Sequence, residues 1–389
     1  MSSPVSDGSV PGFAPNDPAE GTRNPRVLLF SQRGLDGLLS RSITCEFEDV
    51  ILGIDDVTLI APGPTPSYPW RNRLANQLAK RLPIIVNPGL DRIPVEPDYD
   101  LFLAVAEFPW DLSALAAMPD WRRRCRRAIC WIEELWPGQL STFRGYAKLL
   151  SRFDHVILNC KHTAEPLQSM IGTPCHYLPP GVDAIRFCPY PDPPQRNIHV
   201  YSIGRRGPVT HEALLRHCER ERLWFFHDTV NTHQPKQTDN LQSHRNLFAN
   251  TAKRSRYFVA NVAKIDLRFG IAAKQEVGSR FFEGAAAGTV MFGEPPDTEV
   301  FRELFDWPDA VIRVPYDSPD APAILTELDR DPERLARIRR DNIVNSLLRH
   351  DCLYRWQKII DLAGLDPLPA FHQRENRLRE LAELAKQDL

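Results

Sequence analysis

Short runs of apolar residues alternate with helix-forming stretches along the first half of the chain. Within each run the apolar positions are nearly continuous, and continuous apolar strands separated by helices are typical of a parallel sheet covered on both faces. The expected strands span residues 26–31, 56–62, 83–86, 100–107, 127–134, 155–160 and 175–183. We therefore predict an α/β fold, with a Rossmann-like domain over residues 26–187.

Residues 188–196 interrupt this alternation with a cluster of prolines. Proline lacks the amide hydrogen and fixes φ, so such a cluster opposes both a helix and a central strand. The alternation then restarts, with strands expected at 197–204, 223–229, 257–262, 289–294 and 310–315. We predict a linker at 188–196 and a second Rossmann-like domain over 197–349, with the two domains facing each other across a cleft.

The two ends of the chain differ from its middle. Residues 1–25 mix prolines with serine, glycine and aspartate and show no apolar periodicity, so we expect a disordered tail. At the other end Leu353, Trp356 and Ile360 follow helical spacing, and Leu378 and Leu381 do so again. Residues 350–389 are therefore predicted to form helices that return to the first domain.

Composition narrows the range of functions. The 389 residues include 48 Lys and Arg against 50 Asp and Glu, a net charge of −2, which removes the broad basic surface of a dedicated nucleic-acid-binding protein. The eight cysteines are scattered and form no Cys-x-x-Cys pair, which is typical of reduced thiols in the cytoplasm. No apolar run approaches the ~18–20 residues of a transmembrane helix. We expect a soluble, cytoplasmic protein that binds no nucleic acid.

Five of the seven residues from 121 to 127 are arginines. Such a run is most often a solvated loop or helix face. Peripheral contact with an anionic membrane surface or with an acidic acceptor stays open as the alternative. No pattern in the sequence indicates an oligomeric state.

Two common nucleotide-binding motifs are missing. The first expected strand runs into residues 31–37, where Gly34 and Gly37 do not have the Gly-x-Gly-x-x-Gly spacing of a nicotinamide-binding loop. No Gly-x-x-x-x-Gly-Lys-[Ser/Thr] segment occurs either, which argues against a P-loop.

The densest group of candidate binding residues lies at 274–289. Gly278 permits close backbone approach to a ligand, and Ser279 is a favourable N-cap. This pattern predicts a loop that leads into a helix whose N-terminus faces an anionic ligand. An ordinary core helix with an Arg280–Glu283 pair fits the same residues and remains an alternative.

Three segments carry a family resemblance. Residues 283–289 read Glu-Gly-Ala-Ala-Ala-Gly-Thr before an apolar strand, residues 178–187 read Leu-Pro-Pro-Gly-Val-Asp-Ala-Ile-Arg-Phe, and residues 201–205 read Tyr-Ser-Ile-Gly-Arg. In this order they resemble the donor motif, the interdomain loop and the first strand of the second domain of retaining, GT-B-fold glycosyltransferases of the group 1/family 4 type. Arg280 and residues 130–136 are similar to the spore-maturation-type branch of that group.

The resemblance implies roles for individual residues. Glu283 is expected to bind the nucleotide ribose, and Arg205 to neutralise the pyrophosphate together with the helix N-terminus near Ser279. The donor-binding residues expected on this basis are Gly204, Arg205, Arg206, Lys274, Gly278, Ser279, Arg280, Glu283 and Thr289.

The sequence departs from the family pattern at two places. The family has a second glutamate at a fixed spacing before the Glu283 position, and here Gln275 occupies that position while Glu276 lies one residue closer. We favour Glu276 as the catalytic acid that contacts the sugar, with Gln275 as the alternative. The family lysine beyond Gly-Arg is also missing, and Arg206 or Lys274 is expected to replace its charge.

Two pairs of acidic residues elsewhere in the sequence are candidates for metal ligands or acceptor-binding groups. Asp98 and Asp100 match the Asp-x-Asp of metal-dependent glycosyltransferases, but they precede a strand instead of following one, so we expect no metal. Glu133 and Glu134 follow an apolar strand and should lie at the cleft edge, where a carboxylate can orient an acceptor hydroxyl. A plain surface turn is the alternative for this pair.

Together these patterns predict a metal-independent, retaining glycosyltransferase that needs no cofactor. It is expected to move a sugar from a nucleotide-diphosphate sugar to an unidentified acceptor, with Arg205, Glu276 and Glu134 as catalytic residues. The resemblance implies that the leaving phosphate accepts the proton of the acceptor on the same face. A nucleotide-sugar epimerase or hydrolase, and a catalytically silent GT-B binding module, are the alternatives.

Overall fold

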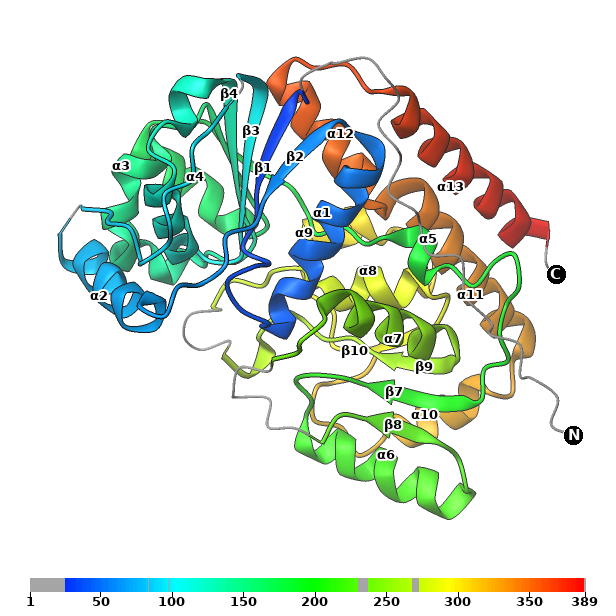
Figure 1. Cartoon of the computed structure of the whole chain (residues 1–389). Coiled ribbons are helices and arrows are strands. Elements are labelled where there is room, and N and C mark those ends of the chain that lie inside the picture. The colour runs from blue at the N-terminus through cyan, green and yellow to red at the C-terminus, as the bar shows by residue number, and fades with distance from the viewer. Residues whose placement is uncertain (1–24, 83, 97, 230–236, 268–272, 388–389) are drawn as a thin grey trace, which may run out of the picture.

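Two parallel β-sheets with flanking helices make up the part of the chain that the computed structural model describes: residues 25–229, 237–267 and 273–387, apart from 83 and 97 (Figure 1). This architecture confirms the predicted α/β class with two Rossmann-like domains, here named the N-domain and the C-domain after the order of their sheets. The tail expected at residues 1–25 lies outside the described residues, except for Pro25.

The N-domain sheet has the order β2-β1-β3-β4-β5-β6, with every neighbouring pair parallel. All residues of β1 are buried, because helices cover both faces of the sheet. The strands are β1 (Val27–Phe30), β2 (Val57–Ile60), β3 (Tyr99–Ala106), β4 (Cys125–Ile132), β5 (His155–Leu158) and β6 (Cys175–Tyr177). The α-helices are α1 (Ser42–Ile54), α2 (Tyr68–Arg81), α3 (Ala147–Leu150), α4 (Lys161–Ile171) and α5 (Ala184–Phe187), and the 3-10 helices are η1 (Leu39–Arg41), η2 (Pro109–Ala117), η3 (Trp121–Arg124) and η4 (Pro137–Tyr146).

The strand expected at 83–86 is wrong for its described residues, 84–86, which belong to no strand. The side chain of Asn87 accepts hydrogen bonds from the amides of Gly89 and Leu90, at 2.9 and 2.8 Å. This local turn replaces strand pairing, and Ile84 is left half exposed. The apolar run at this point therefore carried no information about a sheet.

The C-domain sheet has the order β11-β10-β9-β7-β8 and is also parallel throughout. Its strands are β7 (Ile198–Ser202), β8 (Phe225–His227), β9 (Ser255–Val259), β10 (Val290–Gly293) and β11 (Ile312–Arg313). Its helices are α6 (Pro208–Glu221), α7 (Leu241–Lys253), α8 (Ser279–Ala286), α9 (Glu299–Leu304), α10 (Ala321–Leu328) and α11 (Pro332–Asn345). Helix α8 packs closely on this sheet, because a Cβ at Gly284 would lie 2.8 Å from Met291 Sδ and Phe258 Cδ1.

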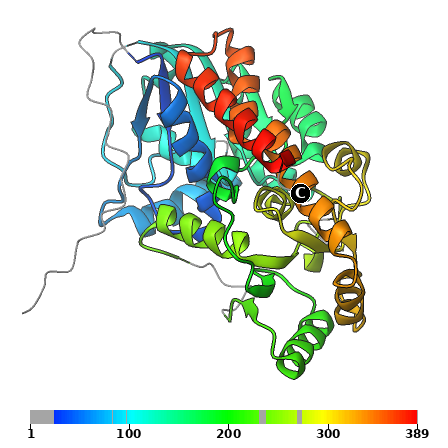
Figure 2. The same cartoon turned by 90° about the vertical axis from the view of Figure 1, so that its right-hand side faces the viewer.

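The last two helices return to the N-domain. After a π-helical turn, Ser346–His350, they are α12 (Cys352–Ala363) and α13 (Pro369–Gln387). The fully buried Trp356 donates from Nε1 to Asp55 Oδ2 at 2.9 Å, and helix α13 packs on α1 and α11 (Figure 2). No helix in the described ranges is long and apolar enough to cross a bilayer.

Helix α1 joins the two domains. It lies between the N-domain sheet and the C-domain, where it packs on α7 (Figure 1). One apolar cluster includes Phe47 and Ile51 of α1 together with Phe248 of α7 and Phe282 of α8. The domains therefore share buried apolar surface next to the site described below.

Candidate functional site

A cavity of about 770 Å³ lies between the two domains. Its N-domain wall is built from residues that follow β3 and β4 and from the start of α1, including Glu107 and Glu134. Its C-domain wall is built from residues that follow β7 and β9 and from the N-terminus of α8. The cavity thus lies at the carboxyl ends of both sheets, where open α/β sheets bind their ligands.

The loop after β7 supplies a cation to the C-domain wall. Gly204 has φ +85°, a left-handed conformation that a residue with a side chain rarely adopts, so glycine lets the chain turn directly after the strand. Arg205 follows, and its Nη1 donates to both carboxylate oxygens of Asp266, at 2.8 and 2.6 Å. About a third of the Arg205 side chain stays exposed towards the cavity.

The N-terminus of α8 also forms part of this wall. Gly278 occupies the N-cap position with an ordinary φ of −80°, and Ser279 is the first helical residue. The expectation that Ser279 caps the helix is therefore wrong, whereas Gly278 does line the cavity. No side chain caps this helix end. The first amides of a helix lack intrahelical acceptors, so this end is suited to binding an anion.

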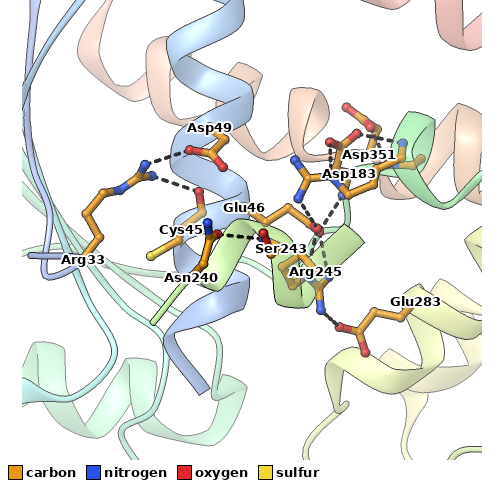
Figure 3. A network of polar contacts seen from close by, with 12 residues as sticks. Arg33, Cys45, Glu46, Asp49, Asp183, Asn240, Ser243, Arg245, Glu283 and Asp351 are labelled. Atoms are coloured by element: carbon orange, nitrogen blue, oxygen red, sulfur yellow. Dashed lines mark hydrogen bonds and ion pairs between the residues drawn. The ribbon is translucent and has the colours of Figure 1, made fainter. Parts of the chain in front are cut away.

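Below the α8 terminus, Glu283 binds two arginines and forms one end of a buried network of polar contacts (Figure 3). Its Oε1 accepts from Arg245 Nη1 and its Oε2 from Arg280 Nη1. Burial alone would raise the pKa of Glu283, but Arg280 and Arg245 outweigh it and hold that pKa below the usual value. Arg245 and Arg280 lie in the cavity wall, whereas the Glu283 carboxylate lies beneath it.

Arg245 connects this network to the N-domain. Its Nε and Nη2 donate to the two oxygens of Glu46 on α1, both at 2.8 Å. Glu46 also accepts from the amide of Asp183 at 3.0 Å and from Arg186 Nη1 at 3.3 Å. Glu46 of the N-domain therefore positions Arg245, and Arg245 in turn positions Glu283 in the C-domain.

The N-domain wall carries carboxylates. Glu107 is 3% exposed, and burial raises its pKa to about 7, with Glu134 and Asp111 adding to the rise. Glu133 lies behind them, and burial, Glu107 and Glu134 raise its pKa well above the usual value. Glu134 forms an ion pair across the cavity with Lys264, which follows β9.

Comparison with known proteins identifies the fold to which this architecture belongs. Residues 219–361 match a family model described as "Glycosyl transferase-like". An alpha-glucosyltransferase solved with UDP and a 13-mer DNA containing an HMU base superposes with a TM-score of 0.53, at 12% identity over 88% of this chain and 99% of that one. The fold is that of a GT-B glycosyltransferase.

Other structures extend this comparison. The alpha-glucosyltransferase with UDP and a 13-mer DNA containing an A:G mismatch gives a TM-score of 0.51 at 12% identity, over 88% of this chain and 99% of that one. TarM from S. aureus gives 0.43 at 11% identity, over 68% of this chain and 55% of that one. No curated protein sequence matches the chain.

Two residues expected at the sugar lie outside the wall of the GT-B cavity. Glu276 Oε2 accepts from the amide of Lys161 at 3.0 Å, and its Oε1 accepts from the amide of His162 at 3.1 Å. This carboxylate therefore caps α4, and Gln275 Oε1 accepts from the amide of Asp297 at 2.7 Å. Both residues line a separate cavity of about 160 Å³. Glu276, which the sequence favoured as the acid that contacts the sugar, thus binds main-chain amides of α4.

Three expected donor-binding residues also lie elsewhere. Thr289 is fully buried in the C-domain core, where its hydroxyl donates to the carbonyl of Gly284 at 2.9 Å. Arg206 forms an ion pair with Asp228 at 3.0 Å and lines a small separate pocket. Lys274 is exposed and does not line the cavity. The assignment of Thr289 to the donor site is wrong, because no part of its side chain reaches solvent.

One cation of the cavity wall was not expected from the sequence. Lys264 lies in the cavity wall, 5.6 Å from the ring centre of Trp136. Strand β9 pairs with β7, so the loop that holds Lys264 lies beside the loop that holds Arg205. Sequence reasoning missed it because only the strand order brings the two loops together.

The metal expectation concerned Asp98 and Asp100, which lie at the amino end of β3, opposite the cavity. Asp98 forms an ion pair with Arg124 at 3.2 Å. Within the described ranges, no three His, Cys, Asp or Glu side chains are grouped so that they could hold a metal ion.

Proposed function

We propose that this protein transfers a sugar from a nucleoside-diphosphate sugar, held by the C-domain wall, to an acceptor held by the N-domain wall. The observation that carries the proposal is the convergence of Arg205, Lys264 and Arg280 with the uncapped N-terminus of α8 on one wall of an interdomain cavity. A pyrophosphate needs cationic and amide donors in this arrangement. The glycosyltransferase-like family model, which covers most of the C-domain, supports the same reading.

The donor wall also supports a chemical role. As the bond between the anomeric carbon and the phosphate oxygen breaks, negative charge develops on the leaving diphosphate. Preorganised donors at such a charge are usually the largest catalytic term. Arg205 and Arg280 are positioned to supply them without a metal ion, so we propose metal-independent transfer.

The stereochemical proposal is retention. The proposal rests on the resemblance of residues 178–187, 201–205 and 283–289 to retaining enzymes. Among the described residues that line the C-domain wall there is no Asp or Glu to attack the anomeric carbon, so we propose that no covalent glycosyl-enzyme forms. In a same-face reaction the acceptor oxygen bonds to that carbon while the departing phosphate oxygen takes the acceptor proton. No protein nucleophile is needed, and atoms and charge balance.

Calorimetric titration with UDP and with uridine tests the donor assignment. UDP is the first choice because the superposed alpha-glucosyltransferase structures were solved with it, and GDP, ADP and dTDP complete the panel. We expect one diphosphate to bind at least tenfold more tightly than its nucleoside, with or without EDTA. Equal binding of diphosphate and nucleoside contradicts the assignment. In a separate incubation with a UDP-sugar, release of free sugar without transfer would identify a hydrolase instead.

A further inference from the structure

The two walls of the cavity carry opposite charges. Every charged residue among the described lining residues of the C-domain wall is a cation, namely Arg205, Arg245, Lys264 and Arg280. The charged residues of the described N-domain wall are Glu107 and Glu134, and Glu134 is paired with Lys264 of the opposite wall. This separation matches a reaction in which one substrate is anionic and the other is not, because like charges facing each other in a low-dielectric site repel strongly.

Glu107 has an unused binding capacity. Its side chain lies in the cavity wall and is 97% buried, yet its Oε2 has no hydrogen-bond partner among the described residues. Arg41 Nε is the nearest cation at 3.9 Å, but Arg41 is already paired with Asp111 at 2.9 Å. A buried acceptor atom without a partner is costly, so a ligand hydroxyl or ammonium that donates to it is favoured.

An aromatic pair lies beside this carboxylate. The rings of Phe108 and Trp110 are stacked, with centroids 4.4 Å apart and planes inclined by 16°, and both residues line the cavity. Trp110 also stacks on Phe143, with centroids 5.6 Å apart, so the side of this stack faces the cavity. Ser40 and Gln139 line the same wall and add hydrogen-bonding groups. Aromatic faces with a few placed polar groups suit a ligand that has an apolar face and a polar edge.

From this wall we infer that the acceptor is a polyhydroxylated ring, uncharged or amine-bearing, and not a phosphorylated compound or a polyanion such as DNA. One face of the ring packs against the part of the Phe108–Trp110 stack that lines the cavity, and its hydroxyl edge donates to Glu107 and Glu134. The inference rests on the proposed function, because it assigns the acceptor half of the same cavity. An anionic group at this edge would face Glu107 directly and would compete with Glu134 for Lys264.

Saturation-transfer NMR with matched ligands tests the inference. The probes are the methyl glycosides of glucose, galactose and mannose, glucosamine, and the 6-phosphate of each of these four compounds. They are measured on the full chain with and without UDP. We expect at least one uncharged glycoside or glucosamine to bind, and its phosphorylated counterpart to bind at least tenfold more weakly. Equal or tighter binding of the phosphates overturns the inference, and so does the absence of binding by all uncharged and amine-bearing probes.

Two variants tie the binding to this wall. Glu107→Gln is expected to reduce the preference for the uncharged ring over its phosphate to less than threefold, and Trp110→Ala to weaken the uncharged ring at least tenfold. Glu165→Gln on the exposed face of α4 and Trp224→Ala, with an exposed ring in the C-domain, are the matched controls and should leave binding unchanged. Wild-type behaviour of both wall variants overturns the assignment.

The UDP titration separates the two claims. Each variant is titrated with UDP, and unchanged UDP affinity shows that the fold and the donor wall are intact. If UDP binds and the phosphorylated rings bind best, the acceptor inference fails while the proposed function stands. If UDP and the other diphosphates do not bind, the proposed function fails whichever rings bind.

Discussion

Arg245 on α7 and Glu46 on α1 form a two-point ion pair across the domain boundary, with both hydrogen bonds at 2.8 Å. The remaining Nη1 of Arg245 binds Glu283 at the base of α8 (Figure 3). The position of the Glu283 carboxylate is therefore set by the packing of the N-domain on the C-domain. Neither residue carries a sequence motif, and their contact depends on the α1–α7 packing.

Removal of Glu46 should destabilise the protein strongly. Glu46→Ala leaves the buried Arg245 with only part of its counter-charge, and breaking a buried pair in this way costs about 3–5 kcal/mol. Urea unfolding measures the loss. Glu212→Ala is the control, because Glu212 pairs with Arg216 on the solvent-exposed face of α6 and should cost less than about 1 kcal/mol. Equal losses for the two variants would show that the network does not stabilise the fold.

The donor-wall arginines should act through the phosphates. Arg205→Ala and Arg280→Ala each remove a charge-assisted contact, for which we expect a loss of about 1.5–3 kcal/mol in UDP binding, or roughly ten- to hundredfold. Uridine binding should not change, because uridine has no phosphate. Arg216→Ala on α6 is the control. If the two wall variants weaken uridine as much as UDP, the arginines support the pocket and do not bind phosphate.

Glu107 should give the reaction a pH dependence. Burial raises the pKa of Glu107 to about 7; Asp111 and Glu134 also favour the neutral form, whereas Ser40 and Arg41 favour the charged one. The carboxyl is protonated below that pH and ionised above it. Since the ionised form accepts hydrogen bonds more strongly, kcat/KM for the acceptor should rise with pH and level off above about 7.

The matching variant isolates this titration. In Glu107→Gln the group does not ionise, so the limb near pH 7 should disappear while KM for the donor stays constant with pH. A variant that keeps the wild-type limb would assign the titration to another group.

Gly284 should be required for the packing of α8. Gly284→Ala places a methyl group against Met291 and Phe258, and overpacking of this kind costs about 1–3 kcal/mol. Gly53→Ala is the opposite control, because a Cβ at Gly53 on exposed α1 surface meets no atom within 4 Å. That variant should gain about 0.5–1 kcal/mol, since alanine loses less entropy than glycine in a helix. Thermal unfolding of the pair measures both signs, and a stabilised Gly284→Ala would contradict the packing.

Local patterns predicted the fold well. Continuous apolar runs such as β1 and β3 are dictated by burial on both faces of a sheet, and the structure places strands at both. The run at 84–86 failed because the Asn87 side chain holds a turn that periodicity does not reveal. Where burial determines the conformation of a segment, its hydrophobic pattern predicts that conformation. Where a hydrogen bond from a single side chain determines it, the hydrophobic pattern does not.

Sequence patterns predicted only some of the residues in the cavity wall. Arg205, Gly278, Ser279 and Arg280 lie in the cavity wall, and their segments carried motif-like patterns. Lys264, Arg245 and Glu107 also lie in that wall, but strand order and helix packing bring them there.

Glu276 is the opposite case, a residue that the sequence predicted for the site but that lies outside the cavity wall. Its position next to a motif favoured a role at the sugar, but its oxygens are bound by the amides of Lys161 and His162 on α4. Those partners belong to the other domain, so no local pattern could have revealed them.

Sugar transfer itself tests the central claim most directly. UDP-glucose, UDP-galactose and UDP-N-acetylglucosamine are each incubated with the methyl glycosides in the presence of EDTA, and products are followed by mass spectrometry with NMR of the new anomeric proton. The account predicts a glycoside heavier by one sugar residue, an equimolar amount of UDP, retained α configuration, and no product from the glycoside 6-phosphates. Tight UDP binding with no transfer to any uncharged or amine-bearing ring, or transfer only to phosphorylated rings, would contradict it.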